Sequence, residues 1–382
     1  MPITREPYAG ARTISSRLHS YFTHKREEAL CRDAECRLAS VPDAGTVEAV
    51  IDAAFWTSLR REEGYSPRIS LAFLAPHETR NALLFERPLA LDPGALARVA
   101  LAVEKPGIHL GVWHAGEEIC VWGITRVIPV LCFVVEVAAP GLLVVKHYRG
   151  EESRKFANVA VLEGDQIKLV EQRPTGRPEP PPLLKSLLGF DNPASGPRSA
   201  ITMVQLALSM SSHGHGALLL VVPAGSETWR ESIVQPVPYA ASPPFGEIAC
   251  LNQPSHGPIE PHAWQEALAS AVDSVSGLTA VDGAVVLNSR YEVLGFGGRI
   301  ARRRGWPRIE EVLLTEPIEG AEPVVVHPQQ LGGTRHSAAA QFVHDQRDGV
   351  ALVASQDGRF TIFEWSADDD KVRAHRIESL LL

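Results

Sequence analysis

Three short segments in the carboxy-terminal half combine residue types that suit nucleotide and metal binding. The first, Asp282-Gly283-Ala284, places a carboxylate beside a glycine, which lets a ligand or another backbone approach closely. A carboxylate in that setting can hold a divalent metal and polarise a hydroxyl group. The alternative interpretation of the same segment is a turn that leads into a strand.

The second segment, Gly332-Gly333-Thr334-Arg335-His336, precedes an expected helix. Glycines and a hydroxyl at a helix N-terminus offer backbone N–H groups and a positive dipole end to an anion. Arg335 adds a fork of donors that suits phosphate oxygens. The alternative is that Thr334 only caps the helix and Arg335 is solvated.

The third segment, Ser355-Gln356-Asp357-Gly358, lies between two expected strands. The hydroxyl of Ser355 could bond a phosphate oxygen. A simple hairpin turn is the alternative, and read alone the segment favours it.

Regular elements surround all three segments. Apolar residues at helical spacing predict helices over 201–210, 264–275 (closed by Gly277 as its C-cap) and 335–344. Short apolar runs predict strands over 217–222, 284–287, 291–296, 350–354 and 360–365. We therefore expect an α/β domain over 198–370, with a central mixed sheet flanked by helices, and a tail over 371–382.

A proline-rich stretch separates this domain from the rest of the chain. Residues 174–182 read PTGRPEPPP, which stiffens the chain and withholds backbone donors, so a linker is expected over 172–197. The block before it, 1–171, contains both helical and strand-like spacings of apolar residues, which predicts a smaller α+β domain. Its expected helices cover 47–59 and 94–103, and its expected strands cover 69–74, 109–113, 118–122, 130–137, 142–147, 159–162 and 166–170.

Composition narrows the classes of function. The 382 residues carry a net charge of -8, which argues against nucleic acid or an anionic membrane surface as partner. Five cysteines without a C-x-x-C pair support neither a disulfide framework nor a zinc ribbon. The most apolar run, 127–145, is broken by Pro129, Glu136 and Pro140, so a membrane span is not expected. A cytoplasmic protein is the expectation.

Taken together, the three segments resemble a known family. Asp282-Gly283-Ala284, Gly333-Thr334-Arg335-His336 and Ser355, with the early strand segment Gly216-Ala217-Leu218-Leu219, are similar to the motifs of the diadenylate cyclase (DAC) domain. The resemblance covers about 170 residues, and the pair of D-G-A and T-R-H motifs in one domain is fairly specific. The first block resembles, in general layout, the sensor domain called DACNV that precedes some DAC domains; its ligand is unknown.

The resemblance implies that two ATP molecules are condensed into cyclic di-AMP, or a related cyclic dinucleotide, between two facing domains. Asp282 would bind Mg²⁺ or Mn²⁺ and assist deprotonation of a 3′-hydroxyl. Arg335 and His336 would take part in catalysis, and the nucleotide-binding set would be Gly283, Ala284, Gly333, Thr334, Arg335, His336 and Ser355. One chain supplies one site, so a homodimer or higher homo-oligomer is implied.

Two departures from the family pattern leave an alternative open. Ser337 stands where the family has a second arginine, and Gln356 stands where it has an acidic residue. Five arginines could replace the lost phosphate contacts, or form a solvated basic loop: Arg299, Arg302, Arg303, Arg304 and Arg308. The alternative function is a catalytically degenerate, nucleotide-binding sensor, and a third is a two-domain interaction protein that binds no nucleotide.

Overall fold

The chain divides into two compact units, and each is described by itself. The computed structural model describes residues 6–32, 37–61, 64, 66–150, 156–170, 182–188, 196–252, 261–318, 320–356, 359–377 and 381. The division falls between residues 176 and 177, inside the segment expected to be a linker. Most of that linker lies outside the described residues. No helix in the described ranges is both long and apolar enough to cross a bilayer.

The first unit is a mixed sheet with helices on one face. Its strand order is β2-β4-β3-β1-β5-β6-β7-β8, and only the β1–β3 pair among these neighbours is parallel. The strands are β1 (Ser70–Phe73), β2 (Leu83–Ala90), β3 (His109–Ala115), β4 (Glu118–Thr125), β5 (Phe133–Ala139), β6 (Leu142–Tyr148), β7 (Phe156–Glu163) and β8 (Gln166–Leu169). The helices are α1 (Ala9–Arg32), α2 (Ala44–Ser58) and α3 (Pro93–Val99).

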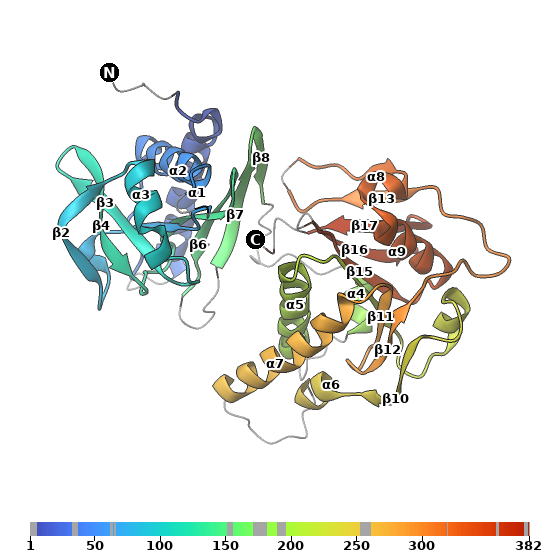
Figure 1. Cartoon of the computed structure of the whole chain (residues 1–382). Helices are drawn as coiled ribbons and strands as arrows, with labels where there is room; N and C mark the ends of the chain where they lie inside the picture. The colour runs from blue at the N-terminus through green and yellow to red at the C-terminus, as the bar shows by residue number, and fades with distance from the viewer. Residues whose placement is uncertain are drawn as a thin grey trace. The chain divides into compact units, whose positions relative to one another are not determined.

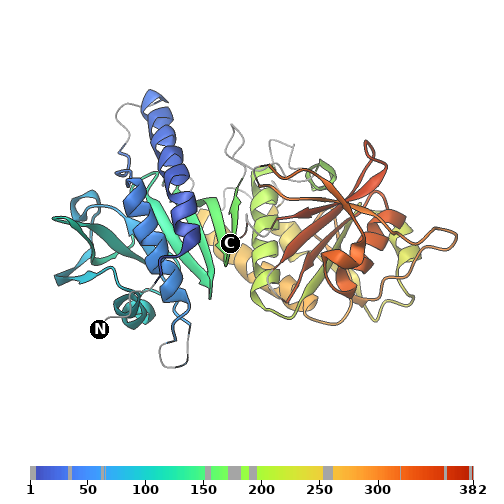
Figure 2. The ribbon, with the colours of Figure 1, turned by 90° about the horizontal axis from the view of Figure 1, so that it is seen from above.

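Helices α1 and α2 lie side by side over this sheet (Figure 2). Asp43 begins α2, because its side chain accepts a hydrogen bond of 2.9 Å from the Thr46 N–H. Buried residues of both helices pack on alternate residues of the strands, such as Leu71 and Val135. The other face carries a smaller apolar cluster around Trp122.

The second unit has a larger mixed sheet with helices on both faces, which confirms the expected layout (Figures 1 and 2). Its strand order is β10-β12-β11-β9-β15-β16-β17-β13-β14. The strands are β9 (Ala217–Val222), β10 (Tyr239–Phe245), β11 (Ala284–Asn288), β12 (Val293–Gly298), β13 (Val312–Thr315), β14 (Val324–Val326), β15 (Val350–Ala354), β16 (Phe360–Ser366) and β17 (Lys371–Arg376). The helices are α4 (Pro182–Leu187), α5 (Gly196–Ser212), α6 (Glu247–Asn252), α7 (Pro261–Thr279), α8 (Pro328–Leu331) and α9 (Thr334–Asp345).

Helix positions explain why the central strand β9 is apolar throughout. Leu219 and Val221 pack with α5 and α7 on one face, while Leu218 and Leu220 pack with α9 on the other. A strand covered on both faces needs apolar residues at every position. β10 contains Pro243 and Pro244, which suit its place at the sheet edge because proline cannot donate to a ladder.

The differences from the sequence expectations include a strand, a helix and a helix end in the second unit. Residues 371–376, expected in a tail, form β17, which pairs with both β16 and β13. Residues 182–187, expected in the linker, form α4, because its N-terminal N–H groups bond the buried carboxylate of Glu364. Gly277 does not cap α7, which continues to Thr279.

Candidate nucleotide site

Strand register brings two of the three chemical segments to one edge of the second sheet. β11 runs parallel to β9 with Val285 opposite Leu219, and β15 runs antiparallel to β9 with Ala354 opposite Ala217. The starts of β9 and β11 and the end of β15 therefore meet at the same edge. Asp282, two residues before β11, and Ser355, directly after β15, therefore lie on either side of the start of β9.

Gly283 is required by its surroundings. Its φ of +108° is a conformation that side chains rarely adopt, and a Cβ atom there would lie 2.5 Å from the carbonyl carbon of Gly297. The entry to β11 thus packs directly on the end of β12, where Ala284 pairs with Gly298. The consequence is that Ala284 is buried while Asp282 is exposed at the edge.

Asp282 is available for a ligand. Its side chain is 86% exposed and lies 3.8 Å from Arg299, measured from Oδ2 to Nη2. Arg299 is also largely exposed, and an ion pair between exposed side chains contributes about 1 kcal/mol or less. A bound cation or nucleotide can therefore displace Arg299 from this carboxylate at little cost.

A divalent metal at Asp282 would take few ligands from the protein. Within the described ranges, no group of three or more His, Cys, Asp or Glu side chains is placed to hold a metal. Mg²⁺ commonly binds through one or two carboxylates and takes its other ligands from water and substrate phosphates. The single exposed carboxylate of Asp282 fits that mode of binding and does not fit a metal cage made of protein alone.

Arg335 reaches the same edge from the first turn of α9. A Cβ atom at Gly216 would lie 2.8 Å from Arg335 Nη1 and 3.5 Å from Gln356 Cγ, so the guanidinium lies against the start of β9 beside Gln356. Gly216 has a φ of +72°. Within the described ranges Arg335 forms no ion pair, so its charge is available to an anion.

Two histidines that were not predicted as site residues lie next to Arg335. The rings of His213 and His215 stack with centroids 5.8 Å apart, and the His215 N–H donates to His213 Nδ1 at 3.2 Å. Burial, and then the charges of His215 and Arg335, lower the pKa of His213. Their spacing in H-G-H-G, directly before a buried strand, was the signal available in the sequence.

The other residues of the G-T-R-H segment differ from one another in exposure. Gly333 is the N-cap of α9, so Thr334 is its first helical residue, contrary to the alternative that made Thr334 the cap. Thr334 is exposed and free to face a ligand. His336 is only 2% exposed, and its ring packs edge-on to Phe363 and closely against Gly332. The His336 ring is thus packed inside the unit, whereas Thr334 is exposed.

Ser355 continues from β15 into a turn. Its N–H and its Oγ both donate to the carbonyl of Arg359, at 2.9 and 3.2 Å. Gln356 Nε2 donates to the carbonyl of His215 at 3.4 Å, which ties this turn to the start of β9. Residues 357 and 358 of the predicted turn lie outside the described residues.

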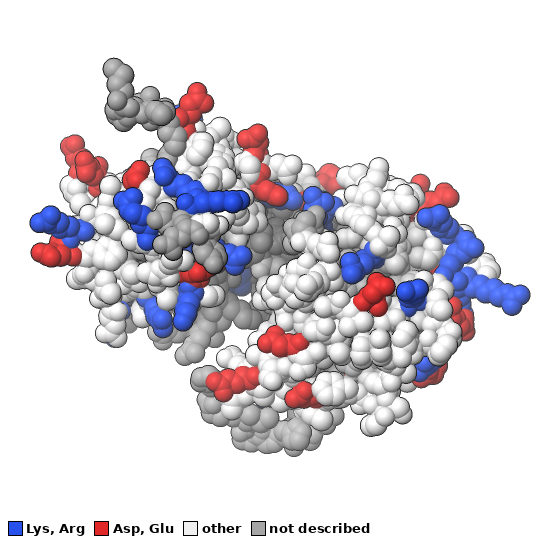
Figure 3. Space-filling view, viewed as in Figure 1, with Lys and Arg blue, Asp and Glu red and all other residues white. Residues whose placement is uncertain are grey.

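The five arginines that could replace lost contacts do not act as one group. Figure 3 shows basic side chains gathered on a margin of the second unit, where Figure 1 draws an orange loop. Arg303 is engaged, because its Nε lies 2.7 Å from Glu231 and its N–H donates to Asp345. Of the others, Arg299 lies beside Asp282 and Arg308 lines a separate cavity.

An exposed aromatic surface adjoins the glycines of this edge. Tyr239 stacks on Phe296 with ring centroids 4.6 Å apart, and 53% of Tyr239 is exposed. A Cβ atom at Gly297 would lie 2.9 Å from the Tyr239 ring. This surface was not predicted, because β10 was not expected.

Residues 36–126 match the family model described as "Probable sensor domain DACNV". The first unit is of the DACNV type. The match spans α2, α3 and β1 to β4. The expected resemblance of the first block is therefore confirmed.

Comparisons with whole proteins add less. Among solved structures, the chain is similar to DacA from Staphylococcus aureus, crystallised as a double mutant, at 15% identity over 45% of this chain and 83% of that chain. The TM-score of 0.24 is low, and this likeness gives no information about the site in the second unit. A search of curated proteins finds no match.

Proposed function

We propose that the second unit is a nucleotidyltransferase of the diadenylate cyclase type, regulated by the DACNV unit. It would condense two ATP molecules into cyclic di-AMP, or a related cyclic dinucleotide, and release pyrophosphate. The observation that supports this most is the meeting of Asp282, Gly216 and Arg335 at one sheet edge, each from a different motif of the resemblance. The DACNV match over residues 36–126 supports it independently, because the resemblance implies that a domain of this type precedes some DAC domains.

The proposed step is the same at both phosphates of the product. A 3′-hydroxyl loses its proton and its oxygen bonds the α-phosphorus of the other nucleotide. The bond from that phosphorus to the oxygen bridging to the β-phosphate breaks, and pyrophosphate leaves. The protein has to hold the oxygen and phosphorus in line and offset the developing charge.

The residues of this edge suit those tasks. Arg335 and the N–H groups of the first turn of α9 can bind phosphate oxygens, and the exposed hydroxyl of Thr334 adds a donor. Asp282 would hold Mg²⁺ or Mn²⁺, which when bound supplies charge that offsets the phosphates and lowers the pKa of the hydroxyl. Tyr239 offers a face on which an adenine base can stack.

Two chains are needed in this proposal. Each chain carries one Asp282 edge, whereas the product requires two nucleotides that attack each other. Two copies would therefore bring their edges face to face, in an isologous contact if the pair is symmetric.

A second candidate function is nucleotide binding without turnover. Gln356 is engaged with the His215 carbonyl and brings no negative charge to the edge, and Arg299 faces the carboxylate that the metal would need. Both features would leave a site that binds ATP and reacts slowly or not at all.

Labelled ATP separates these candidates. The full chain is incubated with labelled ATP and Mn²⁺, and the products are separated by chromatography. A cyclic dinucleotide together with pyrophosphate supports the cyclase. A thermal shift with ATP but no product supports the binding-only sensor, and neither signal would reject both proposals.

A further inference from the structure

A cavity of about 200 Å³ lies on the other side of α9 from Arg335. It is lined by Arg308 and Ile309 from the segment before β13, His327 and Pro328 at the start of α8, and Ser337, Ala338 and Gln341 on α9. Ser337 is two residues beyond Arg335, hence about 200° around the helix. The cavity is therefore distinct from the edge that holds Asp282 and Arg335.

Hydrogen bonds hold the walls of this cavity in place. Gln341 accepts from the Ile309 N–H at 3.0 Å and donates to the Pro307 carbonyl at 3.2 Å, which fixes the Arg308 segment against α9. His327 caps α8, because its Nδ1 accepts from the Gln329 N–H at 3.2 Å. A preformed cavity loses little conformational entropy when a ligand binds.

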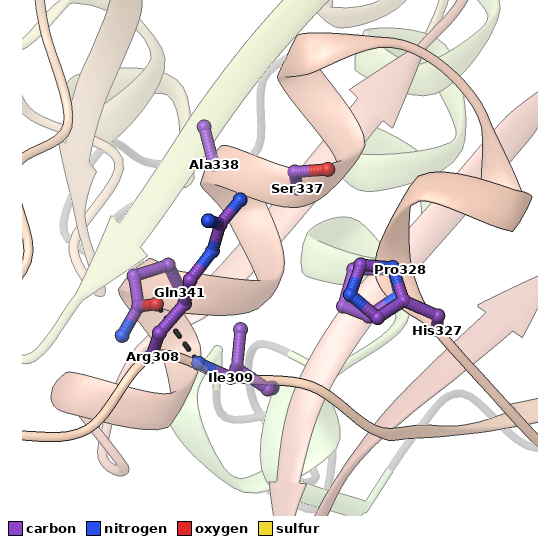
Figure 4. Close-up of a pocket in the computed structure, with 7 residues that line it drawn as sticks. All are labelled: Arg308, Ile309, His327, Pro328, Ser337, Ala338 and Gln341. Carbon is purple, nitrogen blue, oxygen red and sulfur yellow. Dashed lines mark hydrogen bonds between the residues drawn. The ribbon is translucent and has the colours of Figure 1, made fainter.

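Three polar side chains of the lining can donate to an occupant: Arg308, His327 and Ser337. The amide of Gln341 is already engaged with Ile309, Pro307 and Asp345. With Nδ1 accepting, the neutral His327 ring carries its proton on Nε2 and can donate from there. In the described part of the chain, neither the Arg308 guanidinium nor the Ser337 hydroxyl has an ion pair or hydrogen bond that engages it. Figure 4 shows the Arg308 side chain extending along α9 to Ala338, with His327 and Pro328 across the cavity from it.

The lining contains no carboxylate. The nearest acids along the chain are engaged or turned outward: Glu311 pairs with Lys371, Asp345 accepts from Gln341, and Glu310 is exposed. A guanidinium with added neutral donors and no acid is the donor set that binds oxyanions. The volume lies below the roughly 300 Å³ at which pockets for organic ligands begin, so the occupant is small.

We propose that this cavity binds a phosphate-type oxyanion, through Arg308, His327 and Ser337. The oxyanion can be free phosphate or pyrophosphate, or the terminal phosphate of a nucleotide whose base stays outside. The site shares α9 with Arg335, so an occupant contacts the same helix turn that carries the candidate nucleotide site. The proposal does not depend on the chain being a cyclase.

Calorimetric titration of the full chain tests it, with inorganic phosphate, pyrophosphate and ATP as separate probes. Arg308→Gln removes the charge at an exposed position and should lower pyrophosphate affinity about tenfold or more. Arg302→Gln is the matched control, since Arg302 is exposed in the same segment but does not line the cavity. It should leave the affinity within about twofold, because it removes an equal charge from outside the cavity. Ala338→Leu, which fills the cavity, should weaken pyrophosphate as Arg308→Gln does.

The titration with ATP identifies the source of the oxyanion. If Arg308→Gln weakens pyrophosphate and ATP alike in an Arg335→Gln background, the cavity takes the terminal phosphate of a nucleotide. If it weakens only phosphate and pyrophosphate, the cavity takes a free oxyanion. Pyrophosphate binding that is unchanged in both Arg308→Gln and Ala338→Leu, or lost only in Arg335→Gln, overturns the proposal.

Discussion

At the scale of single residues, Gly283 determines how the candidate carboxylate is presented. Gly283→Ala should destabilise the second unit by about 1–3 kcal/mol, because its φ is +108° and the new methyl would meet the Gly297 backbone. Chemical denaturation measures the change. Gly277→Ala is the control: it lies inside α7 with open space around it, and should stabilise by about 0.5–1 kcal/mol. Equal effects of the two substitutions would contradict the close approach at Gly283.

Single residues also mark what the sequence could and could not predict about the site. The D-G-A and G-T-R-H spacings were sufficient to select Asp282 and Arg335. The burial of His336 was not predictable, because it depends on packing against Phe363, which lies on strand β16. The stacked pair His213 and His215, and the exposed ring of Tyr239, become neighbours of the site only through strand register and helix packing.

At the scale of elements, α4 is held to the sheet by one buried acid. Glu364 on β16 accepts from the N–H groups of Leu183 and Leu184, at 2.8 and 3.4 Å, and its other oxygen lies 3.2 Å from His375 Nε2. Glu364→Ala leaves these donors without an acceptor, so it should cost about 1–3 kcal/mol. Hydrogen exchange of the peptide over 182–188 should rise strongly. Glu310→Ala, at an exposed position, should leave it unchanged; protection of 182–188 retained in Glu364→Ala would refute this anchoring.

The elements themselves were predictable where they show a clear period. Strands such as β9 and β15 have continuous apolar runs and helix α2 has a regular stripe, so all three were expected. Helix α1 was missed, although Ile14, Leu18 and Phe22 recur at one turn, because charged residues dominate its second half. β17 was missed because its sequence, KVRAHR, alternates polar and apolar residues only briefly, and its pairing with β13 and β16 is a long-range contact.

At the scale of the whole molecule, two buried histidines predict that the stability of the DACNV unit depends on pH. Burial, and then Lys146, lowers the pKa of His109 to about 4, and burial lowers that of His147 to about 4. Unfolded histidine titrates near pH 6.5, so below that pH the unfolded chain binds protons that the folded unit does not. Stability should be full above about pH 6.5 and fall as the pH is lowered to about 4, by up to about 3 kcal/mol per histidine.

Hydrogen exchange measures this loss of stability. Peptides from β1, β3 and β6 are followed between pH 7 and pH 4.5, with the rates corrected for intrinsic exchange. His109→Asn should flatten the dependence, while His77→Asn, at an exposed position, should keep it. If the pH dependence persists in both His109→Asn and His147→Asn, other groups cause it and the prediction is wrong.

The proposed pairing of two chains makes activity depend on concentration. If each product needs two facing edges, specific activity should rise with protein concentration until pairs are saturated. Turnover measured across a wide dilution range, beside light scattering, tests this. Constant specific activity from a chain that stays monomeric at every concentration would contradict the facing pair.

The most direct test of the central claim compares turnover and binding in Asp282→Asn. The amide keeps the shape of the side chain but loses the charge that would hold the metal, so cyclic-product formation should fall by orders of magnitude. ATP binding should be largely retained, because Arg335 and the first turn of α9 are untouched. Asp273→Asn, an exposed carboxylate on α7, serves as the control with wild-type turnover. Product formed by Asp282→Asn at the wild-type rate would contradict the account.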